Sequence, residues 1–123
     1  MRLAVLASGT GSICQAIIDA HVDVAAVVAD RTCGVIDLAN AGGVPAFLVE
    51  RTDFGPDFDR AQFSRDIVTT LQQADIDVVA MAGFGTVLDA PFFDAFDGRV
   101  LNTHPTLLPS FPGWHGVRDA LRH

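Results

Sequence analysis

Residues 3–12 read Leu-Ala-Val-Leu-Ala-Ser-Gly-Thr-Gly-Ser, an apolar run followed at once by a turn with two glycines. A short run without polar residues predicts a strand buried on both faces, as in a parallel sheet. Ser12 is followed three residues later by Gln15, which is typical of a capping box, so we expect a helix over 13–21. A strand, a glycine turn and a helix in succession favour an α/β fold.

The same alternation of apolar runs and helical patterns continues along the chain. Further strands are expected at 24–29, 46–49, 76–82 and 99–103, and further helices at 35–41, from a cap at Asp57 to residue 74, at 91–96 and from about residue 117. Helical crossovers between the strands predict a three-layer, Rossmann-like, mostly parallel sheet with helices on both faces. Because no linker or repeat interrupts the pattern, we expect residues 1–123 to form a single domain.

The composition excludes several classes of partner. The chain has 123 residues, is half apolar, and carries a net charge of -7 with only 8 Lys and Arg residues. Nucleic-acid binding needs clustered cations, so we expect no nucleic-acid partner. The apolar run at 3–7 is too short for a signal-peptide core or a membrane span, so we expect no membrane partner and a cytoplasmic location.

Two kinds of catalytic site find no support in the residues. Cys14 and Cys33 lack a metal-ligand spacing and are expected as reduced thiols. His104 and His115 have no evident third ligand, so no metal site is expected. The sequence contains no G-x-S-x-G elbow, which argues against a Ser-His-Asp hydrolase.

The first loop of the predicted sheet is suited to bind phosphate. Ligands of parallel sheets bind beyond the carboxyl ends of the strands, where this loop lies. The amides of Gly11, Ser12 and Ile13 would point at an anion from the start of a helix. A tight turn without a ligand is the plainer alternative. A dinucleotide site is a further alternative, because Asp30 ends the second strand, but the fingerprint lacks its third glycine at Cys14.

Two further loops follow strands at the same predicted edge. The loop at 83–88 could offer backbone groups to a flat heterocycle, or could be a plain connection. Asn102 and His104 end the last strand two residues apart, so they point to the same side. An amide donor and an imidazole together can stabilise an oxyanion and move a proton, although a single His at a strand end is often structural.

The run Asn102-Thr103-His104-Pro105-Thr106-Leu107-Leu108-Pro109 resembles the N-x-H-P-S-L-L-P signature of the folate-dependent formyltransferases. Residues 5–12 and the Pro112-Gly113-x-His115 ending are similar to the group of that family that formylates glycinamide ribonucleotide in purine (IMP) synthesis. The resemblance implies an enzyme that takes 10-formyltetrahydrofolate as formyl donor and glycinamide ribonucleotide as acceptor, without a metal.

The resemblance also implies roles for individual positions. Asn102 and His104 match two of the family's catalytic residues, and Gly11, Ser12 and Ile13 match its phosphate site. The folate pocket is expected to involve Asn102, Gly85, Thr86, Val87, Leu88 and Arg60, although Arg60 could instead be a solvated helix charge. The family usually has Met-Arg where this chain has Gly85-Thr86, which would alter the wall of that pocket.

The family's pattern continues beyond the position of His123 and there supplies a third catalytic residue, an aspartate that orients the histidine. We therefore expect the present residues to be an incomplete fold with little activity alone. An open sheet edge would favour a homodimer or pairing with the missing C-terminal part. A non-catalytic phosphate-binding module is the alternative from another class. A formyltransferase with a tRNA or sugar-nucleotide acceptor is another, but the acidic charge disfavours tRNA.

Overall fold

A computed structural model describes residues 1–19 and 23–103 of the chain, and only the backbone of Ile13, Asn102 and Thr103. Strands and helices alternate along these residues, as the apolar pattern predicts. The elements in chain order are β1 (Leu3–Ala7), α1 (Ser12–Asp19), β2 (Val24–Ala29), α2 (Gly34–Ala41), β3 (Ala46–Leu48), α3 (Arg60–Gln73), β4 (Val78–Ala82), α4 (Ala90–Ala95) and β5 (Val100–Thr103).

The five strands form one parallel sheet in the order β3-β2-β1-β4-β5. β1 lies at the centre, where Val5 pairs with Val27 of β2 on one side and with Ala80 of β4 on the other. Strands β2 and β3 extend the sheet on one side of β1, and strands β4 and β5 then extend it on the other side. The switch point of the topology therefore lies between β1 and β4, where parallel sheets bind their ligands.

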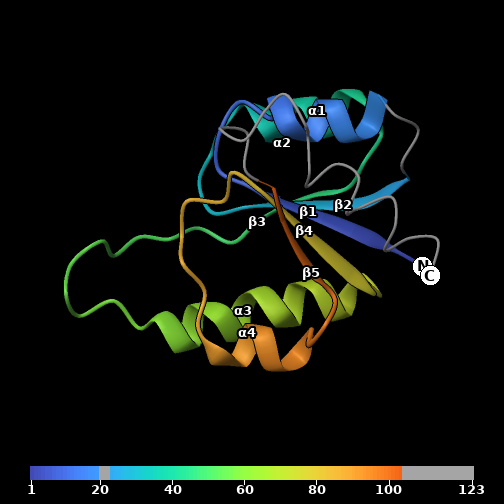
Figure 1. Cartoon of the computed structure of the whole chain (residues 1–123). Coiled ribbons are helices and arrows are strands. Elements are labelled where there is room, and N and C mark those ends of the chain that lie inside the picture. The colour runs from blue at the N-terminus through green and yellow to red at the C-terminus, as the bar shows by residue number, and fades with distance from the viewer. Residues whose placement is uncertain (20–22, 104–123) are drawn as a thin grey trace.

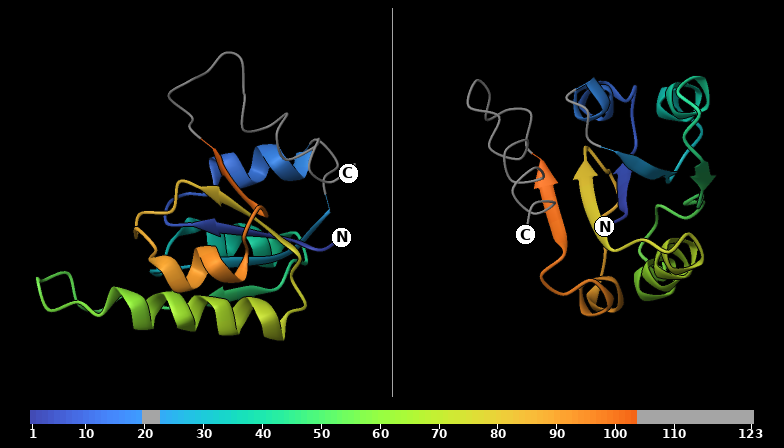
Figure 2. Two further views of the ribbon diagram at one scale, coloured as in Figure 1. Left: turned by 60° about the horizontal axis from the view of Figure 1, so that its bottom comes forward. Right: turned by 90° about the vertical axis from the view of Figure 1, so that its right-hand side faces the viewer.

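Two helices cover each face of the sheet, which gives the three layers that were predicted (Figures 1 and 2). The alternating side chains of β1 explain the arrangement, because successive residues of a strand point to opposite faces. Leu3, Val5 and Ala7 pack in the core under α1 and α2, whereas Ala4 and Leu6 pack in the core above α3 and α4. All five side chains are buried, so a strand without polar residues is explained by cover on both faces.

The predicted cap of the long third helix was wrong. The helix begins at Arg60, and Asp59 is its N-cap, because the Asp59 carboxylate accepts a hydrogen bond from the backbone N–H of Gln62 at 3.0 Å. Asp57 lies two residues before that cap and outside the helix. Both aspartates suit an N-cap by residue type, and the position of the first helical turn decides between them.

The other boundaries differ from expectation by one or two residues, which is the usual uncertainty at element ends. Ser12 is the first residue of α1 rather than the residue before it, and the side-chain amide of Gln15 donates to Asp19 at 2.6 Å. Strand β4 begins at Val78, after a buried Ile76. The first helix was predicted to end at residue 21, and a last helix was predicted to begin at about residue 117. Both positions lie outside the described residues.

Candidate functional site

Loops 8–12 and 83–88 meet at the carboxyl edge of the sheet because they follow the neighbouring strands β1 and β4. The backbone N–H of Ser8 donates to the carbonyl of Gly83 at 3.2 Å, and the N–H of Gly85 donates to the Ser8 hydroxyl oxygen at 2.6 Å. Two regions that the sequence analysis treated separately are thus joined by direct hydrogen bonds.

The backbone of Asn102 reaches the same edge, since it pairs with Met81 of β4 while Thr103 pairs with Ala82. His104, the second expected catalytic residue, lies outside the described residues. The strand register therefore brings the Asn102 backbone beside β4, whose following loop is the one at 83–88.

The first loop turns sharply at Gly11, whose φ of +89° lies in the left-handed region. A Cβ at this position would lie 3.0 Å from Cγ2 and 3.1 Å from Cα of Val35 in α2. The N–H of Val35 in turn donates to the carbonyl of Gly9 at 3.1 Å. Glycine is thus required both by the backbone angle and by the close approach of α2. The next two residues open α1, so their N–H groups have no partner in the helix.

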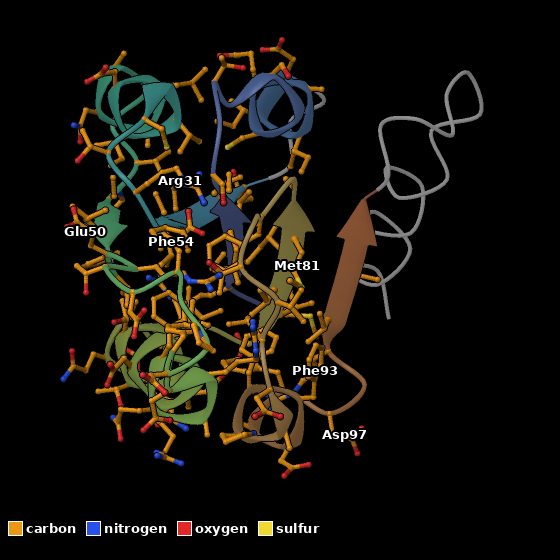
Figure 3. All side chains as sticks on the ribbon, turned by 90° about the vertical axis from the view of Figure 1, so that its left-hand side faces the viewer. Arg31, Glu50, Phe54, Met81, Phe93 and Asp97 are labelled. Carbon is orange, nitrogen blue, oxygen red and sulfur yellow. The ribbon has the colours of Figure 1, made fainter. Side chains whose placement is uncertain are left out.

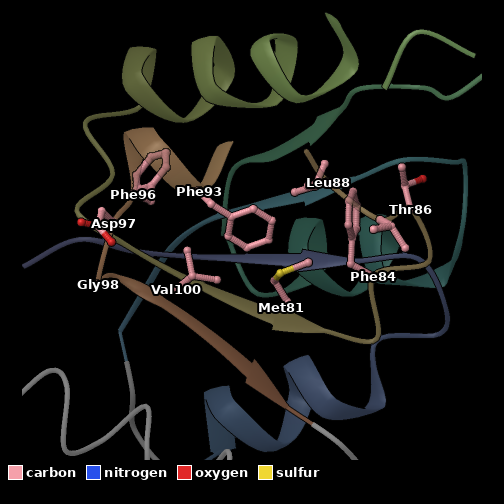
Figure 4. Close-up of a pocket in the computed structure, with 10 residues that line it drawn as sticks. Met81, Phe84, Thr86, Leu88, Phe93, Phe96, Asp97, Gly98 and Val100 are labelled. Atoms are coloured by element: carbon pink, nitrogen blue, oxygen red, sulfur yellow. The ribbon is translucent and has the colours of Figure 1, made fainter. Parts of the chain in front are cut away.

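A pocket of about 530 Å³ lies between strands β4 and β5 of the sheet, the loop that follows β4, and α4 (Figure 4). Thr86, Val87 and Leu88, three of the residues expected to bind folate, are among its lining residues. Their role in folate binding stays a prediction. Gly85 is not among the lining residues; its N–H is directed to Ser8 instead. The walls of the pocket are mainly apolar, and Asp97 is the only ionisable side chain among the described residues that line it. Such walls suit a flat ring system.

Sequence reasoning missed most of the pocket wall. The additional lining residues come from the end of β4, the start of the loop after it, α4, the turn that follows α4 and the start of β5: Met81, Phe84, Phe93, Phe96, Asp97, Gly98 and Val100. A usable signal was present, since Phe93 and Phe96 are three residues apart in and after a short helix and therefore share one side of it.

Arg60 lies just outside the pocket-lining segment. Its Nη1 donates to the carbonyl of Val87 at 2.6 Å, and its guanidinium is 5.3 Å from the ring centre of Phe58. The guanidinium of Arg51 contacts the same ring from 4.0 Å. Arg60 is therefore engaged with loop 83–88, while it remains partly exposed to solvent.

A buried carboxylate also lies at this edge. Asp30, which follows β2, has no exposed surface and accepts hydrogen bonds from the Thr86 hydroxyl at 2.6 Å and from Nε of Arg31 at 3.1 Å. Burial acts to raise the pKa of Asp30, but hydrogen bonds from Arg31, Thr86 and Ser8 and the charge of Arg31 outweigh it and lower the pKa. Because the carboxylate is buried and engaged, it is not available to a ribose, and a dinucleotide site is not supported.

Residues 1–19 and 23–103 contain no group of three His, Cys, Asp or Glu side chains arranged to hold a metal ion. No helix within the same residues combines the length and the apolar character needed to cross a bilayer.

An open, parallel α/β sheet with a glycine turn at the carboxyl end of its central strand and an apolar pocket beside β4 is typical of the general class of nucleotide-type binding folds. Within that class, all 123 residues match the family model described as "Formyl transferase", and the chain belongs to this family. The dinucleotide alternative is thereby replaced by a specific assignment at the family level.

One of the similar proteins is named a formyltransferase, and another is named a purine biosynthetic protein. The chain is 43% identical to a phosphoribosylglycinamide formyltransferase of Mycobacterium tuberculosis, in an alignment that covers 99% of this chain and 58% of that protein. It is 39% identical to the trifunctional purine biosynthetic protein adenosine-3 of Drosophila melanogaster, over 98% of this chain and 9% of that protein.

A solved structure agrees with the assignment. Glycinamide ribonucleotide transformylase 1 from Geobacillus kaustophilus superimposes with a TM-score of 0.74 at 38% identity, over 98% of this chain and 66% of that one. The chain thus spans less than two thirds of the length of these relatives.

Proposed function

We propose that the polypeptide containing this chain transfers the formyl group of 10-formyltetrahydrofolate to the amine of glycinamide ribonucleotide, a step of purine synthesis in the cytoplasm. The names of the relatives support the substrate. The observation that carries the proposal is the direct connection of a glycine turn before α1 to an apolar pocket through loop 83–88.

The ribonucleotide phosphate is assigned to the start of α1. The N–H groups of Gly11, Ser12 and Ile13 lie at the turn into the helix, where free amides and the helix dipole favour an anion. The sharp turn at Gly11 supports this assignment, because a residue with a side chain would be forced out of that backbone angle.

The heterocycle of the folate is assigned to the pocket. Its volume of about 530 Å³ is within the range of sites for small molecules, and aromatic side chains offer stacking surfaces. Thr86, Val87 and Leu88 form part of the wall, and Arg60 at its outer side is assigned to the remainder of the folate. Gly85 contributes by allowing the loop to approach Ser8.

The chemistry needs an amine, a formyl carbon and a group that stabilises negative charge. The amine nitrogen of the ribonucleotide forms a bond to the formyl carbon, and the carbonyl oxygen becomes an oxyanion. The Asn102 amide and the His104 imidazole stabilise that oxyanion. Collapse of the intermediate breaks the bond to N10 of the folate, and the proton lost by the amine passes to N10 with the aid of His104.

The test is formyl transfer from 10-formyltetrahydrofolate to glycinamide ribonucleotide by the natural polypeptide that contains residues 1–123. We expect Asn102→Ala and His104→Ala each to lower kcat by about 10²–10³, the usual effect of losing one oxyanion donor. Residues 1–123 alone are expected to show little activity. A wild-type protein that transfers no formyl group would refute the proposal.

An association between chains is a separate part of the proposal. Among the described strands, β3 and β5 form the two edges of the sheet. An unpaired edge invites another strand, so we infer that this fold pairs with a second copy or with further residues of its own polypeptide. Sedimentation of residues 1–123 as a well-behaved monomer at all concentrations would contradict that inference.

A further inference from the structure

The ion pair at the end of β2 has no part in the reaction proposed above. Arg31 follows Asp30 directly, and its guanidinium lies against that carboxylate through Nε at 3.1 Å. The Asp30 side chain has no exposed surface, whereas 47% of the Arg31 side chain is exposed. The pair therefore keeps its negative end inside the protein and presents its positive end to solvent.

Arg31 lies at the carboxyl edge of the sheet (Figure 3), close to the point where the two loops meet. A Cβ on Gly85 would be 3.2 Å from Nη2 of Arg31 and 3.4 Å from Oγ of Ser8. Ser8 is the first residue of loop 8–12, and its hydroxyl oxygen accepts a hydrogen bond from the Gly85 N–H of loop 83–88. The absence of a side chain at Gly85 thus leaves the space that the guanidinium occupies.

The guanidinium is fixed in place by its partner. Nε of Arg31 donates to Oδ1 of Asp30 at 3.1 Å, and Nη2 of Arg31 donates to Oδ2 at 3.5 Å. The Thr86 hydroxyl also donates to Oδ2, at 2.6 Å. Within the described residues, Asp30 is the only hydrogen-bond partner of the Arg31 side chain. The remaining N–H groups of the planar fork are therefore available to a ligand, and a held guanidinium loses less entropy when it binds one.

We propose that Arg31 is an anion-binding residue that receives the phosphate or carboxylate oxygens of a substrate at the edge between loops 8–12 and 83–88. A guanidinium fork matches both groups, because each offers two oxygens at the right spacing. The substrates' identity rests on the proposed function: the ribonucleotide carries a phosphate, and the folate carries carboxylates on its glutamate.

Kinetics of the natural polypeptide distinguish the two sources of the anion. In Arg31→Met, we expect the KM of one substrate to rise about 10–100-fold, as for loss of a charged hydrogen bond, while kcat changes less than about threefold. A higher KM for the ribonucleotide identifies the phosphate, and a higher KM for the folate identifies the carboxylate. Arg65→Met is the matched control, because Arg65 is exposed on α3 and bonds to Gln62 of the same helix. Changes below about twofold in both KM values would overturn the proposal.

A double variant separates binding from a structural role. Arg31→Met alone leaves the buried Asp30 without its countercharge, which could disturb both loops. In Asp30→Asn/Arg31→Met that charge is gone, and the Asn oxygen can still accept from Thr86. We expect the KM to stay raised in the double variant. A return to the wild-type KM would mean that Arg31 only neutralises Asp30, and the proposal would fail.

A binding measurement keeps the inference independent of formyl transfer. Inorganic phosphate and p-aminobenzoylglutamate serve as probes, and the thermal midpoint of the natural polypeptide is the readout. We expect one probe to raise the midpoint of the wild type and of Arg65→Met by clearly more than it raises the midpoint of the double variant. Should the wild type transfer no formyl group, this result would still support Arg31 while the proposed function fails. Equal stabilisation of all three proteins, or of none, would overturn the role of Arg31.

Discussion

The Thr86 hydroxyl donates a 2.6 Å hydrogen bond to Oδ2 of Asp30, a fully buried carboxylate that lies 56 residues earlier in the chain. Thr86→Val keeps the shape of the side chain but removes the donor, so we expect a loss of about 1.5–3 kcal/mol in the free energy of unfolding. Thr86→Ser keeps the donor and is expected to cost less than about 1 kcal/mol. Urea unfolding of both variants checks this, and equal losses would contradict it.

The same carboxylate predicts a pH dependence. The folded-state pKa of Asp30 is lowered, so its contribution to stability is present above the unfolded-state pKa of about 3.9 and is lost as the pH falls through the folded-state pKa. Asp30→Asn should be less stable than the wild type at pH 7 and should lose less stability between pH 5 and strong acid. Asp94→Asn, at an exposed position of α4, is the control. Parallel curves for wild type and Asp30→Asn would refute the prediction.

Two glycines of the first loop should respond differently to alanine. Gly11→Ala places a Cβ 3.0 Å from Val35 at a φ of +89°, so we expect a loss of about 2 kcal/mol and weaker binding of inorganic phosphate. A Cβ on Gly9 would meet nothing within 4 Å. Gly9→Ala should therefore be neutral, or stabilising by about 0.4–1 kcal/mol. Thermal unfolding with and without phosphate measures both effects.

Adjacent phenylalanines of α4 offer a matched pair. Phe92 is fully buried, whereas Phe93 is 44% exposed and lines the pocket. We expect Phe92→Ala to cost roughly 3–5 kcal/mol through the cavity it leaves. Phe93→Ala should cost about 1 kcal/mol, from its edge-to-face contact with Phe92, and should raise the KM for the folate. Similar losses of stability in the two variants would show that the described burial is wrong.

The two cysteines should differ in reactivity. Cys14 is buried, and burial raises the pKa of its thiol to about 11, so little thiolate forms at pH 8. Cys33 is only partly buried. At pH 8, a thiol reagent should therefore modify Cys33 quickly and Cys14 only as fast as the protein opens. Cys33→Ser, expected to remove the fast phase, is the control, and a fast phase that persists in it would contradict the assignment.

The strands were predicted well because their signal is local. The bounds of β1 and β2 follow from apolar runs of five and six residues with polar residues at their carboxyl ends. The glycine turn before α1 is likewise a property of neighbouring residues. The choice between Asp57 and Asp59 as the N-cap was not predictable in this way. Both residue types suit an N-cap, and only the position of the first helical turn decides between them.

Only part of the pocket wall comes from a loop that the sequence singled out, and the role of that loop in folate binding stays a prediction. Thr86, Val87 and Leu88 were expected from a motif resemblance, but Phe93 of α4 and Phe96, which follows it, belong to the pocket only because the fold packs this segment against the sheet. The link from Asp30 to Thr86 joins different crossovers and leaves no periodic trace in the sequence. The roles of Asn102 and His104 stay predictions, as does the phosphate site at the start of α1.

The hydrogen bonds that join loop 83–88 to Ser8 and Asp30 also affect local unfolding of the protein. The pocket wall is attached to the ends of β1, β2 and β4 together, through residues up to 77 positions apart. The Gly85 amide, which donates to Ser8, should therefore exchange hydrogen only in openings that separate loop 83–88 from loop 8–12. A ligand in the pocket would bind the folded form alone, and would slow exchange in the central strands as well as in the loop it touches.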